Sequence, residues 1–190
     1  RFVTDIGLTG PDQGKGGKYL FMHRDYMGTV SGGYFAVRSP TYRNLCFFRG
    51  FVKDGDLAGT AAAIRSKFRM YPLAQAENPP EQRFMNFSGK KINTVHANNF
   101  KFFEELNAVI QYEPADAFDP ELVGLFASIG IKKGQPFNPD ARMKKILTEA
   151  VATGNATARA LSFAPRKRSV FFYPDRKWTS PFAGMSSEFL

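Results

Sequence analysis

Three predicted strands lie within the stretch that decides the fold class, KYLFMHRDYMGTVSGGYFAVRSPTYRNLCFFRGFV, residues 18–52. Short apolar runs cover residues 18–22, 33–38 and 45–52, and turns containing Gly or Pro separate them. The runs follow one another about 10 to 15 residues apart with no helical segment between them, a spacing typical of antiparallel sheets rather than of βαβ units. We therefore expect an antiparallel, sandwich-like sheet in the N-terminal part.

Two further strands are expected on either side of this stretch, at residues 2–8 and 83–88. Residues 45–52 form the strongest strand candidate, because they are apolar and rich in aromatic residues. The single cysteine, Cys46, lies within that run and is expected to act as a small hydrophobic side chain. One cysteine excludes an intrachain disulfide and a zinc site built from several cysteines.

Helical periodicity follows the strands. Apolar residues at steps of three and four predict helices over residues 57–71, 98–112, 120–129 and 139–161. Asp119 and Pro120 suit the cap and first position of the third helix, and Gly130 suits the left-handed residue after its end. Asn138 and Pro139 repeat this start signal for the fourth helix. The expected fold class is α+β, with an antiparallel sheet followed by about four helices.

Composition narrows the class of protein. The chain has 190 residues, 43% of them hydrophobic, and a net charge of +9, which fits a folded chain rather than a disordered one. No apolar run reaches the roughly 18 residues that a membrane-spanning helix needs. The chain begins at Arg1 with neither Met nor a signal-peptide pattern, so we expect a processed chain or part of a longer protein.

The positive charge is concentrated near the C-terminus. Residues 131–178 contain 11 Lys or Arg and three Asp or Glu, whereas residues 104–121 contain six acidic residues and no basic one. This asymmetry fits a patch for an anionic partner. It also fits a solvated helix face, or a match between the two stretches within the chain or between subunits.

Candidate ligand-binding residues are Arg38, Tyr42 and Arg49, with Lys15 and Lys18 from a glycine-rich turn. An Arg near a strand interior needs a carboxylate partner or an anionic ligand, because burying an unpaired charge is costly. The alternative for Arg38 and Arg49 is a structural salt bridge, with Asp54, Asp56 or an acidic helix. The turn at residues 10–18 lacks the spacing of a phosphate-binding P-loop, and a strand rather than a helix follows it.

No cofactor or metal site is predicted. His23 and His96 are the only histidines, and neither has a carboxylate at a helical i+4 spacing. A metal site would need several ligands to converge in space, so two ordinary histidines are the simpler interpretation. No catalytic triad or nucleophile elbow is indicated by spacing, and whether the chain is an enzyme stays open.

The twenty Phe residues are mostly placed for packing in strands and helix faces, so nucleic-acid binding is not favoured. The exception is the aromatic and basic C-terminal arm, residues 166–190. It is either a binding surface or a contact to another part of the protein. The candidate contact residues in it are Arg166, Arg168, Tyr173 and Trp178.

Several motifs together resemble a bacterial two-domain family, domain of unknown function 1254 followed by domain of unknown function 1214. The stretches that carry the resemblance are Asp5–Gly7, Gly14–Leu20, Gly33–Phe35, Val37–Tyr42, Arg49–Phe51, Tyr71–Leu73, Phe137–Met143 and Tyr173–Trp178. They span nearly the whole chain. The resemblance implies a β-sandwich part and a helical linker, completed by a second jelly-roll-like domain, and a periplasmic or secreted location. It carries over no catalytic residues.

These expectations divide the chain into a β-rich part at residues 1–95, a helical part at 96–165 and the arm at 166–190. The first hypothesis for function is a binding module for an anionic or carbohydrate-like ligand that acts with the second domain. The second is an enzyme whose active site lies at the interface with that domain. The third is a structural or assembly protein, and a homo-oligomer is a further arrangement.

Overall fold

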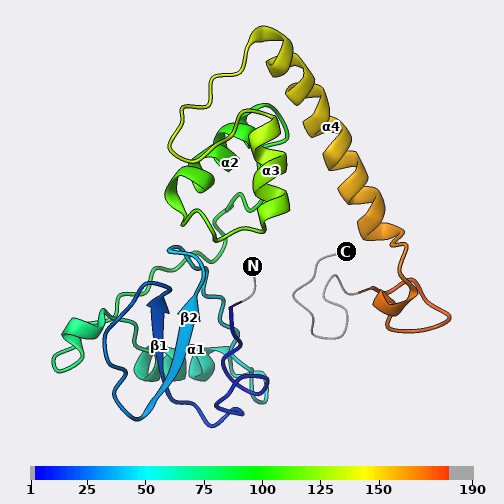
Figure 1. Ribbon diagram of the computed structural model, residues 1–190. Coiled ribbons are helices and arrows are strands. Elements are labelled where there is room, and N and C mark those ends of the chain that lie inside the picture. The colour runs from blue at the N-terminus through cyan, green and yellow to red at the C-terminus, as the bar shows by residue number, and fades with distance from the viewer. Residues whose placement is uncertain (1–2, 180–190) are drawn as a thin grey trace.

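The strands form a small parallel sheet. A computed structural model describes residues 3–179, and in it β1 (Lys18–His23) pairs with β2 (Tyr34–Ser39) from Lys18↔Tyr34 to His23↔Ser39 (Figure 1). Within the described residues the fold is α+β, with four α-helices and this two-stranded sheet. The predicted antiparallel pairing was wrong, and residues 3–179 form no second sheet that would make a sandwich.

The connection between the strands is long enough to permit parallel pairing. Ten residues, 24–33, join β1 to β2. An extended segment of that length reaches about 33 Å, whereas a six-residue strand is about 20 Å long. The chain can therefore return along β1 and begin β2 at the same end without a crossover helix. Spacing between the strands had predicted antiparallel pairing, but spacing alone does not set strand direction.

The predicted strand at residues 45–52 is absent, because this segment lies along α1 (Leu57–Lys67) instead of beside another strand. The Phe48 ring lies 4.6 Å from the Phe68 ring, and the Thr60 hydroxyl donates to the Phe51 carbonyl at 3.3 Å. Cys46 is exposed rather than packed. Residues 3–8 and 83–88 also form no strand, and Phe2 lies outside the described residues.

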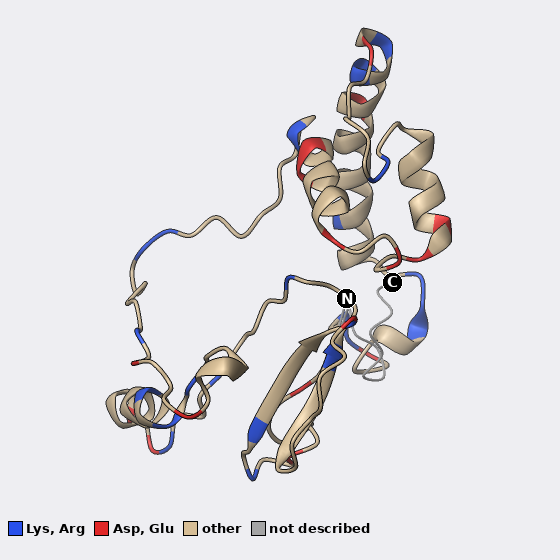
Figure 2. Ribbon diagram, turned by 60° about the vertical axis from the view of Figure 1, so that its left-hand side comes forward, with Lys and Arg blue, Asp and Glu red and all other residues tan. Residues whose placement is uncertain are grey.

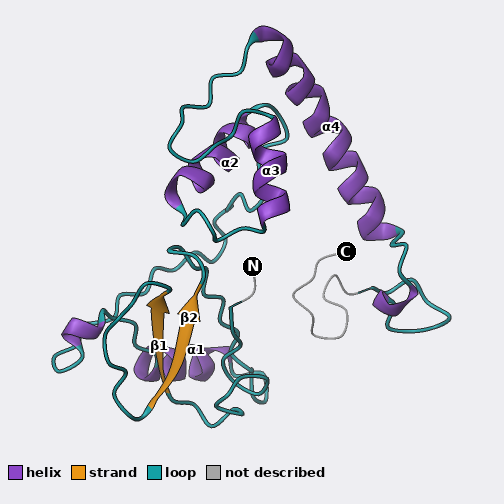
Figure 3. Cartoon of the chain, viewed as in Figure 1, coloured by secondary structure: helices purple, strands orange, loops and turns teal. Residues whose placement is uncertain are grey.

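The first helix stands apart from the sheet. α1 overlaps the strands in Figure 1 but lies away from them in Figure 2, and none of its residues is buried. It ends at Lys67, four residues before its predicted end, where Phe68 becomes extended. A short 3₁₀-helix, Leu73–Gln75, and a long loop then lead to the remaining helices (Figure 3).

Three helices form the main hydrophobic core. They are α2 (Lys101–Tyr112), α3 (Pro120–Ser128) and α4 (Ala141–Phe163). The buried core joins α2 and α4 to the turn after α3, and Phe126 from α3 packs against it. The buried members of this core are Phe103, Ile110, Ile131, Leu147 and Val151. A smaller buried group, Leu20, Met22 and Val37, belongs to the sheet.

Local signals place the ends of α3 as predicted. The Asp119 carboxylate accepts from the Glu121 amide, and Pro120 opens the helix. Gly130 has φ +88°, and the Ile131 amide donates to the Phe126 carbonyl at 2.9 Å. These contacts make a Schellman motif. In α4 the cap is Asp140 rather than Asn138, because the Asp140 carboxylate accepts from the Met143 amide at 2.7 Å.

After α4 the chain forms a short 3₁₀-helix, Arg168–Val170, and a bridge between Phe171 and Thr179. Among residues 3–179, no helix has both the length and the hydrophobicity that crossing a bilayer requires.

Candidate functional site

The carboxyl ends of both strands meet at one edge of the sheet. β1 ends at His23 and β2 at Ser39, and these two residues are register partners. The loops that follow therefore leave the sheet side by side. In open α/β folds, ligands bind outside the carboxyl ends of parallel strands, because loops rather than strands supply the side chains there.

Ser39 organises the loop after β2. Its side chain is buried, and its hydroxyl lies 2.8 Å from both the Thr41 carbonyl and the Asn44 amide oxygen. The same oxygen accepts from the Thr41 amide at 3.1 Å. These short-range bonds close a turn, and the turn presents Tyr42 beside His23, with the two rings 6.2 Å apart.

A buried carboxylate joins this loop to the helical part. Glu113 caps the end of α2 and is only 5% exposed. Its oxygens accept from the backbone amides of Tyr42 at 2.7 Å and Arg43 at 3.3 Å, a pair of contacts that we term the Glu113 latch. Next to it, the Arg43 guanidinium lies 3.9 Å from the Tyr112 ring centre. The latch therefore holds a strand-end loop against α2, 70 residues away in sequence.

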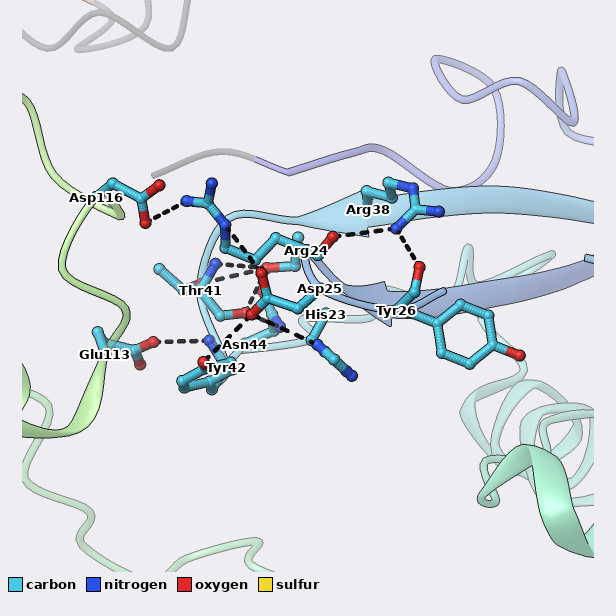
Figure 4. Close-up of polar contacts among 11 residues, drawn as sticks. His23, Arg24, Asp25, Tyr26, Arg38, Thr41, Tyr42, Asn44, Glu113 and Asp116 are labelled. Atoms are coloured by element: carbon cyan, nitrogen blue, oxygen red, sulfur yellow. Dashed lines mark hydrogen bonds and ion pairs between the residues drawn. The ribbon is translucent and has the colours of Figure 1, made fainter. Parts of the chain in front are cut away.

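Three polar side chains converge beside the latch. The Asp25 Oδ2 atom accepts from the Tyr42 hydroxyl at 3.4 Å and lies 4.0 Å from His23 Nδ1 (Figure 4). All three remain accessible, since the side chains of His23 and Asp25 are 50% and 61% exposed and Tyr42 is 46% exposed. We refer to His23, Asp25 and Tyr42 as the strand-end site.

Ion pairs balance the charge around this site. Arg24 lies 3.6 Å from Asp25 and also pairs with Asp116, from the loop after α2 (Figure 4). Asp116 thereby adds a second link between the sheet and the helical part. Three acidic residues, Asp25, Glu113 and Asp116, lie near three basic ones, Arg24, Arg38 and Arg43, so the neighbourhood carries no large excess of either sign.

Arg38 supports the loop after β1. Its Nη1 donates to the carbonyls of Arg24 at 3.1 Å and Tyr26 at 2.8 Å (Figure 4). Since strand side chains alternate between faces, Arg38 lies on the face opposite its neighbour Ser39 and opposite His23, the register partner of Ser39. Among the described residues no carboxylate lies within 4.0 Å of Arg38, so the salt-bridge alternative is not observed.

The other predicted ligand residues lie elsewhere. The Arg49 guanidinium lies 5.3 Å from the Phe47 ring, with no ion pair in the part of the chain that the structure describes. Lys18 begins β1, so it lies at the opposite end of the strand from His23, and its ammonium is 5.9 Å from the Tyr34 ring. Lys15 lies in the exposed turn before β1. The structure thus brings Arg38 and Tyr42 to one edge, and not Lys15, Lys18 or Arg49.

A buried aspartate shapes that glycine-rich turn. The Asp12 carboxylate accepts from the Tyr19 hydroxyl, from the Gly7 amide at 2.7 Å and from the Gly16 amide at 3.0 Å. These bonds, that from Tyr19 most of all, lower the pKa of Asp12, while burial and then the Asp12 contact raise the pKa of Tyr19. The turn is therefore ordered by its own carboxylate.

The C-terminal arm exposes its predicted contact residues. Tyr173 and Trp178 are 50% and 71% exposed, and Arg166 and Arg168 are exposed as well. Val170 is almost fully buried, and the Phe172 amide donates to the Trp178 carbonyl at 2.9 Å. Val170 is thus buried, while the candidate aromatic and basic contact residues of the arm are exposed.

Sequence reasoning missed Asp25 and Glu113 and gave no role to His23. The polar run His23–Asp25, directly after an apolar strand, could have marked these residues as candidates. Only the parallel pairing, however, places the end of β1 beside the end of β2. Nothing in the sequence marks Glu113, because its partners are backbone amides. His96 lies near α2, with its ring 5.4 Å from the Phe102 ring, so the two histidines do not share a site.

Among the described residues, no group of three or more His, Cys, Asp or Glu side chains is arranged to hold a metal ion. No curated protein matches the chain.

Residues 2–72 match the family described as "Protein of unknown function (DUF1254)". This match ends before α2, so the resemblance at residues 137–143 and 173–178 and the second domain, domain of unknown function 1214, stay predictions. The matched segment contains both strands and the strand-end site, and does not contain Glu113. Residues 2–72 of this chain are thus similar to DUF1254, as the motifs in them predicted.

Proposed function

We propose that the chain binds a carbohydrate-like ligand at the strand-end site. The observation that carries the proposal is the convergence of an imidazole and a phenol hydroxyl on the exposed Asp25 carboxylate. A carboxylate accepts hydrogen bonds from sugar hydroxyls, while His and Tyr can both donate and accept. The Tyr42 ring is about half exposed and offers apolar surface to the C–H face of a sugar ring.

Local charge favours a polyhydroxylated ligand over a strongly anionic one. Arg24 is compensated by Asp25 and Asp116, and Arg43 is stacked on Tyr112. In this proposal Arg38 acts by holding the loop that carries Asp25, and Tyr42 contacts the ligand. Lys15, Lys18 and Arg49 take no part in this site.

The test is a binding measurement with defined sugars. Ligand-observed NMR against glucose, galactose, mannose, glucuronate and galacturonate should reveal binding of at least one of them. Tyr42→Phe keeps the ring and removes the hydroxyl, so we expect roughly fivefold weaker binding, the value of about one hydrogen bond of 1 kcal/mol. Asp25→Asn should weaken binding at least as much, because a charged acceptor is lost.

The matched control is Tyr173→Phe, which removes a hydroxyl from an exposed tyrosine in the arm. It should leave binding unchanged. Equal affinity in Tyr42→Phe, Asp25→Asn and Tyr173→Phe, or no binding to any sugar of the panel, would refute the proposal.

The enzyme alternative rests on the same three side chains, because an imidazole beside a carboxylate is suited to general acid–base catalysis. It predicts turnover of a bound sugar derivative that His23→Gln abolishes. Binding without turnover supports the binding module instead.

The proposal keeps two features that the family resemblance implies, a second jelly-roll-like domain and a periplasmic or secreted bacterial location. The exposed rings of Tyr173 and Trp178 support the arm as the contact to that domain, since a large exposed aromatic pair is typical of an interface. Slower amide hydrogen exchange at residues 166–178 in a protein that also contains the second domain than in residues 1–190 alone would support this contact. If this contact forms and no ligand binds, the result supports the structural or assembly role instead.

A further inference from the structure

A pocket lies in the helical part, away from the strand-end site. It has a volume of about 120 Å³ and is formed by the end of α2, the loop before α3, α3 itself and the segment after it. Its walls are mainly apolar, and its principal lining residues are Ile110, Phe118, Val123, Phe126, Ala127 and Ile131. An apolar cavity of about 150 Å³ can hold a benzene molecule, so this pocket has the size for a short aliphatic chain or a single ring.

Two lysines also line the pocket, and no acidic residue does among the residues described. The Lys133 ammonium donates to three carbonyls at the end of α2, those of Gln111 at 2.8 Å, Glu113 at 2.6 Å and Ile110 at 3.4 Å. An ammonium has three N–H groups, so Lys133 contributes charge but no further donor. Lys132 is exposed, and its ammonium has no partner in the part of the chain that the structure describes.

Nearby acidic groups are engaged elsewhere. Asp116 pairs with Arg24, and the Asp119 carboxylate accepts from the Glu121 amide at the start of α3. The Lys132 ammonium is thus the free charged donor among the residues lining this otherwise apolar pocket.

We propose that this pocket binds a small monocarboxylate, with its hydrocarbon part between α2 and α3 and its carboxylate at Lys132. The apolar walls account for the hydrocarbon part and the two positive charges for the carboxylate. A hydrocarbon of about six carbon atoms suits the volume, by comparison with benzene. The site is separate from the strand-end site, although Lys133 contacts the carbonyl of Glu113, whose side chain forms the latch.

The test compares hexanoate with hexan-1-ol, which has a similar chain but no charge. Titrations followed by amide chemical shifts should show hexanoate binding with a Kd of about 1 mM, an ordinary affinity for a ligand of this size, and shifts centred on residues 123–132. Hexan-1-ol should bind several-fold more weakly. Lys132→Glu should weaken hexanoate binding fivefold or more and leave hexan-1-ol binding unchanged, because the substitution replaces attraction by repulsion.

Two matched controls accompany this variant. Lys145→Glu reverses another exposed lysine, on α4, and should change neither affinity. Ala127→Leu fills the pocket and should abolish binding of both probes, whereas Ala152→Leu, exposed on α4, should not. Thermal unfolding of each variant shows whether it is folded. Absence of hexanoate binding at 20-fold above that Kd, about 20 mM, overturns the proposal, and so does equal binding of hexanoate to the folded Lys132→Glu and Lys145→Glu variants.

Discussion

At the scale of single residues, two buried carboxylates stabilise the loops around them by accepting hydrogen bonds from backbone amides. Asp12 and Glu113 are almost fully buried, and both accept from backbone amides instead of pairing with a cation. At Asp12 these hydrogen bonds, that from the Tyr19 hydroxyl first, favour the ionised carboxyl. The glycines around Asp12 predicted a turn. They did not predict that the Asp12 carboxylate would accept the hydrogen bonds that order this turn.

Asp12 links folding stability to pH. Its pKa is lowered in the folded protein, chiefly by the Tyr19 hydroxyl and the Gly7 amide. A carboxyl with a lowered folded pKa stabilises the protein above its unfolded pKa of about 3.8, and that contribution is lost as pH falls through the folded value. We expect Asp12→Asn to lower the melting temperature at pH 7 and the deficit to shrink below about pH 4. Thermal unfolding across pH 2–7 measures this.

The control for Asp12 is Asp54→Asn. Asp54 is exposed and has a positive φ of 51°, which Asn also adopts readily. Its melting temperature should follow the wild-type pH profile. A deficit in Asp12→Asn that stays constant down to pH 2 would contradict the linkage.

At the scale of elements, the helices follow local signals and the strands do not. The ends of α3 were predicted from Asp119, Pro120 and Gly130, because a cap is a contact between residues a few positions apart. The segment at residues 45–52 has stronger β propensity than β1, yet it lies along α1 with its Phe47 and Phe51 side chains 74% and 85% exposed. A strand needs a neighbour to accept its hydrogen bonds, and sequence pattern does not supply one.

Two glycines in and after α3 give opposite predictions. Gly130 has φ +88°, where an L-residue costs about 1–2 kcal/mol, so Gly130→Ala should destabilise the protein by that amount. Gly124 lies inside α3 with open space where a Cβ would go, so Gly124→Ala should stabilise it by about 0.5–1 kcal/mol. Urea unfolding of both variants measures the difference. The same sign of effect for both would show that the Schellman turn does not govern this end of α3.

At the scale of the whole molecule, the acidic and basic stretches of the chain do not pair with each other within the described residues. Figure 2 shows basic segments at the start of α4 and in the arm, and acidic ones on α2 and near the start of α3. Within residues 3–179, no ion pair joins the acidic stretch 104–121 to the basic stretch 131–178. The sheet and the helical part are joined instead by the Glu113 latch and by Arg24 with Asp116.

The latch gives a prediction about how these parts are held together. In Glu113→Gln the side-chain NH₂ group replaces one carboxylate oxygen, so either the Tyr42 or the Arg43 amide loses its acceptor. A buried donor without an acceptor costs about 1–3 kcal/mol. We expect the free energy of unfolding to fall by that amount in urea titrations. Hydrogen exchange at Tyr42 and Arg43 should also become faster.

Glu81→Gln is the control for the latch, because Glu81 is an exposed loop residue that loses the same charge. It should change stability by less than about 0.5 kcal/mol. An equal loss in both variants would mean that charge, and not the contact with the Tyr42 and Arg43 amides, accounts for the effect.

As with the fold, some residues of the candidate site could be predicted from local sequence and others were placed only by tertiary structure. Tyr42 and Arg38 were predicted from the residues after and within one strand, and the DUF1254 match at residues 2–72 was predicted from short motifs. Asp25 and His23 acquire a shared position only because β1 and β2 run parallel and end at the same edge. Glu113 contacts the loop that carries Tyr42 through hydrogen bonds between residues 70 and 71 positions apart, which no local pattern encodes.

Contacts within a few residues were therefore enough to specify the caps, the helices and the glycine turns of this chain, since each of these is stabilised by neighbours in sequence. Strand direction, the exposure of residues 45–52 and the junction of the strand-end site with α2 depend on which distant segments meet. Those arrangements are set by hydrogen bonds and packing between remote residues, and their energies appear only once the chain is folded.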